Sequence, residues 1–212
     1  MKQSKSERYL VISSVIASVI CLTICYMAYS VSVKFEHTID KINKEDFRVS
    51  FSSHPYNLEY SKIKPLSSMD KALGDAIIIS RDGSIITNLH ATFTSPGQSV
   101  TYKLYIINYG AYNAYLESIT FLENSNGKFK TCVTSIITEK STKACEGVNI
   151  KIKIGDKWYT KSETNLKEEL LKGNNKEVLV TIYYDSLATM TDIPLKVYFG
   201  NIKIVYSLFL KK

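Results

Sequence analysis

The feature that most constrains this chain is an apolar run at residues 9–33, which contains no charged side chain. A helix needs about 20 apolar residues to cross the hydrocarbon core of a membrane, and this run is longer than that. Basic side chains outnumber acidic ones in residues 1–8, which the positive-inside rule therefore places in the cytoplasm. We predict a single-pass membrane protein with a cytoplasmic tip at 1–8, a transmembrane helix at 9–33, a stalk at 34–46 and an extracytoplasmic domain at 47–212.

The same apolar run also fits a secretory signal peptide, because the small residues Ala28 and Ser30 flank Tyr29 near its end. Its apolar core is longer than the roughly 7–15 residues of a typical signal peptide, and Ala-Tyr-Ser is a poor processing site. We therefore prefer retention of the segment as a signal anchor in the cell membrane. Cleavage after Ser30, which yields a secreted protein, is the alternative.

The formal net charge of +7 comes from lysines scattered through the chain rather than from a basic run. A nucleic-acid interface gathers Arg and Lys with stacking aromatics on one face, and this pattern is missing from the sequence. Dispersed lysines are typical of solvated strand faces. Besides the membrane, the partners that remain as alternatives are a protein or an anionic cell-wall polymer.

Cys132 and Cys145 are the only cysteines beyond the apolar run. A cysteine pair in an exported segment predicts a disulfide. We place the pair across a hairpin with its turn at 138–139, where it closes a loop of about 14 residues and contributes about 3 kcal/mol. A structural zinc site needs a second pair of ligands, and a redox site needs a close C-x-x-C spacing; the sequence shows neither.

The exported part alternates apolar and polar residues, with turn residues between the runs. Two segments carry the clearest alternation. In the later one, the residues expected to face the core are Val148, Ile150, Ile152 and Ile154. In the earlier one, Val100, Tyr102, Leu104 and Ile106 share one face, and Tyr105 on the other face is exposed if the even-numbered face is inward. A short helical turn is expected at 166–171. Eight to ten short strands argue for an all-β fold, an antiparallel β-sandwich of the immunoglobulin-like or jelly-roll kind. The expected strands are 47–53, 76–80, 84–94, 100–107, 112–122, 129–138, 147–154, 177–184 and 195–209.

Tyrosines are the most distinctive side chains of the exported part. We interpret 100–122 as one tyrosine-bearing hairpin and take Tyr105, Tyr109 and Tyr115 as candidates for a contact surface, because tyrosine buries much area at low entropic cost. Trp158, the only tryptophan, is expected as a core or sheet-edge anchor, and contact with a ligand is its alternative role.

Motifs for catalysis and for metal or cofactor binding are missing from the sequence. It has neither the H-E-x-x-H pattern of zinc proteases nor the G-x-S-x-G pattern of α/β-hydrolases. Its three histidines, His37, His54 and His90, are far apart. We therefore predict no catalytic residue, no metal site and no cofactor. The alternative is an extracellular hydrolase whose residues converge only in the fold, for which His90 would have to meet two carboxylates within about 5 Å.

The segment SPGQSVTYKLYIINYG at 95–110 is similar to a pattern in small membrane-anchored surface proteins of Gram-positive bacteria, which carry immunoglobulin-like, biofilm-fibre or camelysin-like β-sandwiches. The stretches ACEGVNIKIKIGDKWY and VLVTIYYDS also resemble them, so that the likeness covers residues 75–207. The resemblance implies an extracellular β-sandwich. For the fibre group it implies assembly by strand donation, which an unpaired strand 47–53 would favour. The camelysin name implies metalloprotease activity, from which this sequence departs.

The sequence thus predicts a membrane-anchored extracytoplasmic surface protein with a structural or adhesive role. A secreted fibre subunit and an extracellular hydrolase are the alternatives.

Overall fold

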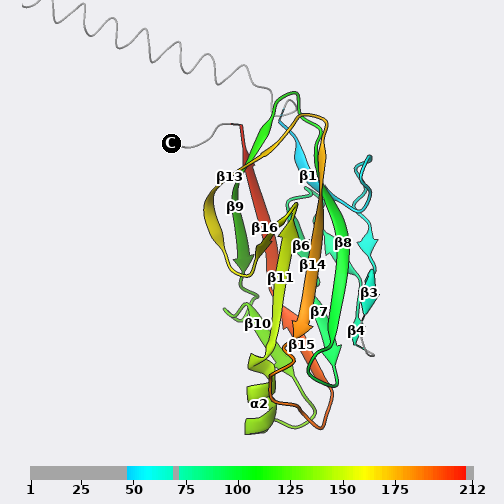
Figure 1. Cartoon of the computed structure of the whole chain (residues 1–212), viewed down its shortest axis with the longest axis vertical. Helices are drawn as coiled ribbons and strands as arrows, with labels where there is room; N and C mark the ends of the chain where they lie inside the picture. The colour runs from blue at the N-terminus through cyan, green and yellow to red at the C-terminus, as the bar shows by residue number, and fades with distance from the viewer. Residues whose placement is uncertain (1–46, 69–71, 209–212) are drawn as a thin grey trace, which may run out of the picture. The chain divides into compact units, whose positions relative to one another are not determined.

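The computed structural model describes residues 47–68 and 72–208. These residues form a mostly β structure of three antiparallel sheets with one short helix (Figure 1). Within the described ranges, no helix has both the length and the hydropathy needed to span a membrane. The predicted cytoplasmic tip 1–8, transmembrane helix 9–33, cleavage site after Ser30 and stalk 34–46 lie outside these ranges.

The first sheet, sheet A, contains the longest strands of the molecule. Two of its strands, β8 and β11, contain the segments with the clearest predicted alternation, and β14 lies between them. In order across the sheet, its strands are β1 (Val49–Ser52), β8 (Ser99–Asn108), β14 (Asn175–Tyr184), β11 (Val148–Ile154) and β12 (Lys157–Tyr159), with β3 (Ser67–Ser68) also paired to β8.

The strands of sheets B and C alternate along the chain. Sheet B runs in the order β13 (Glu163–Leu170), β9 (Ala114–Leu122), β16 (Asn201–Ser207), β6 (Ile85–Thr87), β5 (Ile77–Ile79) and β2 (Lys62–Ile63). Sheet C runs in the order β10 (Lys130–Val133), β15 (Leu195–Phe199), β7 (His90–Phe93) and β4 (Leu73–Gly74).

Two long predicted strands are each divided between sheets B and C. The predicted strand 84–94 breaks at Asn88, whose φ of 60° interrupts the extended backbone between β6 and β7. The predicted strand 195–209 breaks at Gly200, between β15 and β16. A Cβ at position 200 would lie 1.9 Å from the carbonyl oxygen of Leu122, so only glycine allows this close approach.

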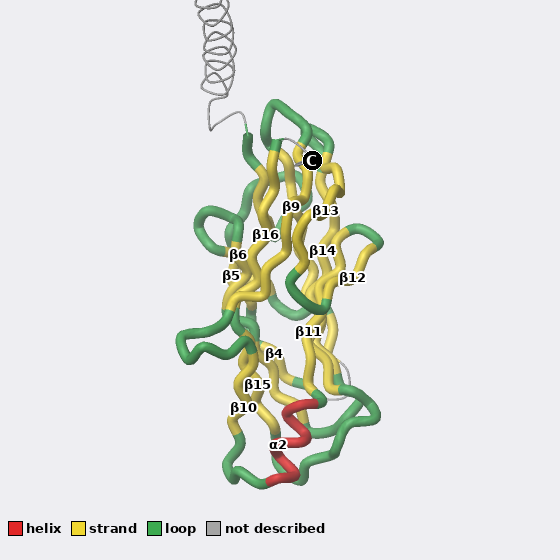
Figure 2. Tube along the Cα trace, turned by 90° about the vertical axis from the view of Figure 1, so that its left-hand side faces the viewer, coloured by secondary structure: helices red, strands yellow, loops and turns green. Residues whose placement is uncertain are grey.

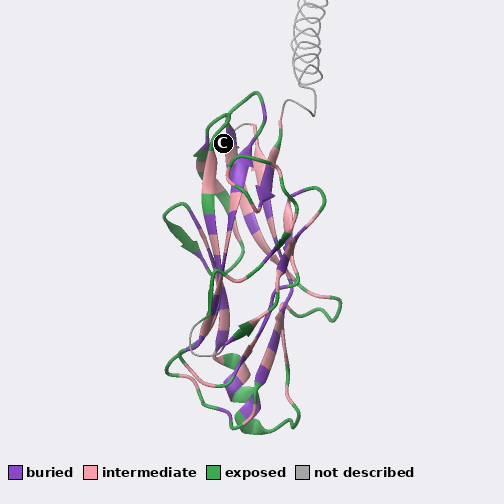
Figure 3. Ribbon diagram, turned by 90° about the vertical axis from the view of Figure 1, so that its right-hand side faces the viewer, coloured by how far each residue is buried: buried purple, intermediate pink, exposed green. Residues whose placement is uncertain are grey.

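The core lies between sheet A on one side and sheets B and C on the other (Figures 1 and 2). Buried positions alternate with partly buried ones along the long strands, as Figure 3 shows. This confirms the predicted inward face of β11 and shows that the even-numbered face of β8 is also inward, because burial removes apolar side chains from water at period two. The residues concerned are Val100, Tyr102, Leu104, Ile106, Val148, Ile150, Ile152 and Ile154, all 4% exposed or less.

The disulfide is confirmed, but the hairpin predicted around it is wrong. Cys132 lies on β10 and Cys145 on the helix α2 (Glu139–Glu146), with 6.0 Å between their Cα atoms. Thr138 begins the helix as its N-cap: its side chain accepts from the N–H of Ser141, and the Ser141 hydroxyl bonds back to the Thr138 N–H. This reciprocal capping satisfies two backbone donors and favours a helix over a turn.

Two further local predictions are wrong. The segment 166–171 belongs largely to strand β13, which pairs with β9 and carries a register shift between Thr164 and Glu168. The predicted hairpin at 100–122 does not form, because β8 pairs within sheet A and β9 pairs within sheet B. The chain crosses from one layer to the other between these strands.

Strand β1 is paired, with Val49 opposite Asn108 and Ser52 opposite Tyr105 on β8. The argument for strand donation that rested on an unpaired first strand is therefore not supported.

Candidate functional site

The outward side of sheet A carries lysine and aromatic side chains. Side chains alternate along β11, and Ile152 and Ile154 point into the core. Lys151 and Lys153 therefore point outward. Trp158 of β12 lies directly opposite Lys153 and shares this side. We call the outward set the lysine–aromatic face; its members are Lys103, Tyr105, Lys151, Lys153, Trp158 and Tyr183 (Figure 1 looks onto this side of the sheet).

Lys151 lies between two aromatic rings of this face. Its Nζ is 4.5 Å from the ring centroid of Trp158 and 5.1 Å from that of Tyr183. Both distances are within the range of cation–π attraction, which contributes about 0.5–1 kcal/mol at an exposed site. The three side chains come from β12, β11 and β14, so neighbouring strands of one sheet position them.

The charge of the face is positive. Lys103 forms an ion pair with Glu177 on the neighbouring strand, and this hydrogen bond raises the pKa of Lys103. Lys151 and Lys153 have no carboxylate within ion-pair distance in the part of the chain that the structure describes. Their charges are therefore available to an acidic ligand.

The four predicted contact residues are separated by the fold. Tyr105 and Trp158 both lie on sheet A, where Trp158 is 42% exposed. Tyr109 lies just beyond the end of β8, and its N–H donates to the carbonyl oxygen of Arg48. Tyr115 lies on β9 in sheet B and donates its hydroxyl to Glu169 at 3.1 Å. These residues do not form one surface.

Sequence reasoning missed the pairing of Lys151 with Tyr183. The outward position of Lys151 was visible in the alternation at 147–154, but the strand beside it was not. The register of β11 against β14 sets Asn149 opposite Tyr183, which brings the tyrosine diagonally next to Lys151.

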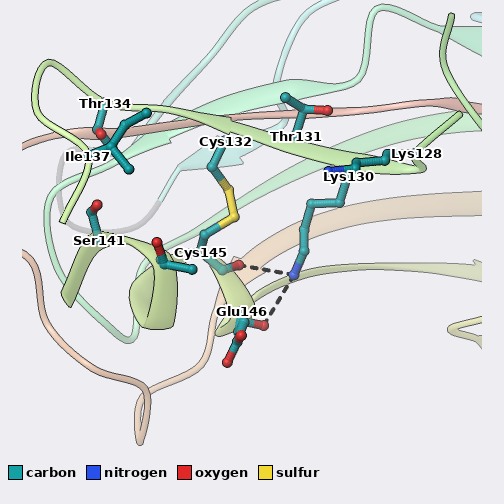
Figure 4. Close-up of a pocket in the computed structure, with 10 residues that line it drawn as sticks. Lys128, Lys130, Thr131, Cys132, Thr134, Ile137, Ser141, Cys145 and Glu146 are labelled. Carbon is teal, nitrogen blue, oxygen red and sulfur yellow. Dashed lines mark hydrogen bonds between the residues drawn. A yellow bond between two sulfur atoms is a disulfide. The ribbon is translucent and has the colours of Figure 1, made fainter. Parts of the chain in front are cut away.

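A hollow of about 300 Å³ lies beside the disulfide, between β10 and α2 (Figure 4). Lys130 lines it and donates from Nζ to the carbonyl oxygens of Cys145, Glu146 and Val148, at 3.0, 3.1 and 2.8 Å. Burial lowers the pKa of Lys130, and Glu146 opposes that shift. An ammonium has three donors, and all three are used here. This lysine therefore stabilises the end of α2 and is not available to a ligand.

His90 is the buried histidine of the described chain. Its Nε2 is 3.3 Å from Asp75, and its ring packs against Tyr198 with 5.1 Å between centroids. Burial lowers the pKa of His90, Asp75 opposes that effect, and Lys196 adds to it. Asp75 is the one carboxylate within ion-pair distance of His90 among the described residues.

Within residues 47–68 and 72–208, no three His, Cys, Asp or Glu side chains lie close enough together to hold a metal ion.

Comparison of the chain with protein families, with curated proteins and with solved structures finds no match.

Proposed function

We propose that this chain is a membrane-anchored surface protein whose extracytoplasmic domain is a β-sandwich of the immunoglobulin-like or jelly-roll kind. Its role is adhesive or structural, and it binds its partner through the lysine–aromatic face of sheet A. The observation that carries this proposal is the Trp158–Lys151–Tyr183 cluster on the solvent side of a sheet whose other side is core.

The location rests on two features that agree. The apolar run at 9–33, with its basic start, is typical of a signal anchor. The Cys132–Cys145 disulfide is typical of an oxidising compartment outside the cytoplasm.

Binding is favoured over catalysis by what the face offers. The aromatic side chains on the solvent side of sheet A provide contact area, and Lys151 and Lys153 provide positive charge. His90, the histidine most suited to acid–base chemistry by its burial, lies on sheet C with its ring against Tyr198. It therefore lies outside the face.

The location is tested by adding protease to whole cells that make the full chain. We expect residues 34–212 to be digested in intact cells. Protection in whole cells, with digestion only after lysis, would contradict the proposed location.

Binding is tested with the full chain in non-ionic detergent and envelope fragments of the producing cells. We expect Trp158→Ala to weaken retention on the fragments by about five- to tenfold, because it removes a 42% exposed aromatic side chain from the face. Tyr112→Ala is the matched control, because Tyr112 is 49% exposed but lies in the connection between β8 and β9. Equal retention of both variants and the unmodified chain would contradict binding through this face.

A further inference from the structure

The lysine–aromatic face extends over four neighbouring strands of sheet A, from Tyr105 on β8 to Trp158 on β12. Two hollows in the described chain, one beside the disulfide and one lined by residues of β1 and β16, include no residue of the face. Because the side chains of the face are spread across several strands, the face is suited to an extended ligand that makes several weak contacts.

The charges on the face indicate the sign of that ligand. Lys151 and Lys153 are two residues apart on β11, which separates their Cα atoms by about 6.8 Å along the strand. Of the outward positions on β8, β14, β11 and β12, only Glu177 carries a carboxylate, and Lys103 neutralises it. The local field therefore favours an anionic chain with repeated charges.

The neutral groups of the face indicate the chemistry between those charges. The rings of Trp158 and Tyr183 flank Lys151 and offer apolar surface to the C–H groups of sugar rings. The hydroxyls of Thr101 and Thr181 on the same side of the sheet hydrogen-bond to each other at 3.1 Å, and Thr181 is buried, so the two rings carry the neutral contacts of the face.

The strand order argues against an acidic peptide as the ligand. A peptide usually adds to a sheet edge through backbone hydrogen bonds. Lys151 and Lys153 lie on β11, which is paired on both sides, with β14 and with β12. A peptide at this position would have only side-chain contacts.

We infer that the lysine–aromatic face binds an extended acidic polysaccharide, with Lys151 and Lys153 pairing its anionic groups and Trp158 packing against its sugar rings. This inference rests on the proposed function, because it names the ligand class of the same face. The anionic groups have two sources to distinguish, carboxylates on the sugars and phosphodiesters between them.

The first test measures binding of the full chain, in non-ionic detergent, to four polymers: polygalacturonate, phosphomannan, neutral dextran and poly-L-glutamate. We expect tight binding to one or both of the first two, weakened about tenfold or more when salt rises from about 0.05 to about 0.5 M, because salt screens exposed charges. Preference for polygalacturonate identifies carboxylates as the source of charge, and preference for phosphomannan identifies phosphodiesters. Equal binding of dextran or of poly-L-glutamate would overturn the inference.

The second test uses paired variants of equal charge. Lys151→Gln with Lys153→Gln should weaken binding to the acidic polysaccharide about tenfold or more, and Lys151→Arg with Lys153→Arg should retain it. Lys167→Gln with Lys203→Gln is the control, because both residues lie on sheet B and the double change removes the same charge. A similar loss in both glutamine pairs would overturn the inference, since net charge alone would then explain binding.

The two proposals fail in different ways. If Trp158→Ala reduces retention on envelope fragments but none of the acidic polymers binds, the face is the binding surface and the ligand class is wrong. If the unmodified chain binds neither the fragments nor the polymers, the proposed function itself is wrong.

Discussion

Replacing Lys130 by methionine should destabilise the domain markedly, although lysine on a strand is usually a solvated residue. The Lys130 ammonium donates to three carbonyl oxygens where α2 ends and β11 begins. Methionine has a similar length and fills similar space, but it donates no hydrogen bond. The substitution therefore leaves three acceptors without their donor and removes a cation from the carboxyl end of a helix.

The size of the effect follows from the three acceptors. A hydrogen bond from a charged group contributes about 1.5–3 kcal/mol when its acceptor is removed from water. The carbonyls of Cys145 and Glu146 lie at the helix end, where water can replace the lysine, so their loss costs less. The carbonyl of Val148 belongs to a residue whose side chain is fully buried. Together with about 0.3–1 kcal/mol from the helix dipole, we expect a loss of about 2–3 kcal/mol.

Urea unfolding of the full chain in non-ionic detergent measures this loss. With a urea dependence of about 2 kcal/mol per M, the midpoint should fall by about 1–1.5 M. Lys128→Met is the matched control, because Lys128 lines the same hollow, carries the same charge and is exposed. If the two substitutions change the free energy of unfolding by amounts within about 0.5 kcal/mol of each other, the role assigned to Lys130 is wrong.

Three other changes test separate parts of the fold. Reducing the Cys132–Cys145 bond should lower the free energy of unfolding by about 3 kcal/mol, the chain-entropy value for a loop of about 14 residues; a loss below about 1 kcal/mol in urea unfolding would contradict this. Gly200→Ala should cost about 1–3 kcal/mol, because its Cβ meets the Leu122 carbonyl oxygen; an unchanged Tm would contradict it. Burial lowers the pKa of His90 below its ordinary 6.5, so the unfolded chain binds this proton more tightly, and stability is lost as pH falls below about 6.5. His90→Gln should flatten the dependence of Tm on pH in that window, and parallel curves would refute this.

The inward faces of the long strands were predictable because their pattern is local. An alternation at period two fixes which side chains point to the core, whatever strand lies beside them. This is why the even-numbered residues of 100–106 form one buried face, and why the even-numbered residues of 148–154 are buried as predicted. The disulfide was also predictable, because the prediction depended only on the two cysteines and on the expected export of the segment that contains them.

The helix α2 was missed because the cysteine spacing suggested a hairpin. A local helix signal was present in the sequence: Thr138 is a typical N-cap residue, and acidic Glu139 follows it in the first turn. In the structure, Ser141 and Ala144, three residues apart, form the buried side of the helix. A disulfide joins a strand to a helix as well as it joins two strands, so the cysteines alone did not discriminate between them.

The arrangement of the sheets was not predictable, because strand pairing depends on contacts between distant parts of the chain. The turn residues at 108–110 indicated where β8 ends, but they did not indicate that the next strand joins another sheet. The predicted tyrosine surface failed for this reason. Its members Tyr105 and Tyr115 are ten residues apart and lie in different layers.

Lysines of similar sequence context therefore have opposite roles in this molecule. Lys130 and Lys151 both lie on strands, yet Lys130 donates to three carbonyl oxygens and Lys151 lies between the rings of Trp158 and Tyr183. The difference comes from the neighbouring element, which is a helix end for Lys130 and an edge strand carrying Trp158 for Lys151. The end of α2 is stabilised by the ammonium of Lys130. Strand β12, in contrast, places the ring of Trp158 beside Lys151 and leaves the charge of Lys151 without a carboxylate partner. The positive charge at Lys151 thus remains directed to solvent, which is why binding is assigned to sheet A and stability to α2.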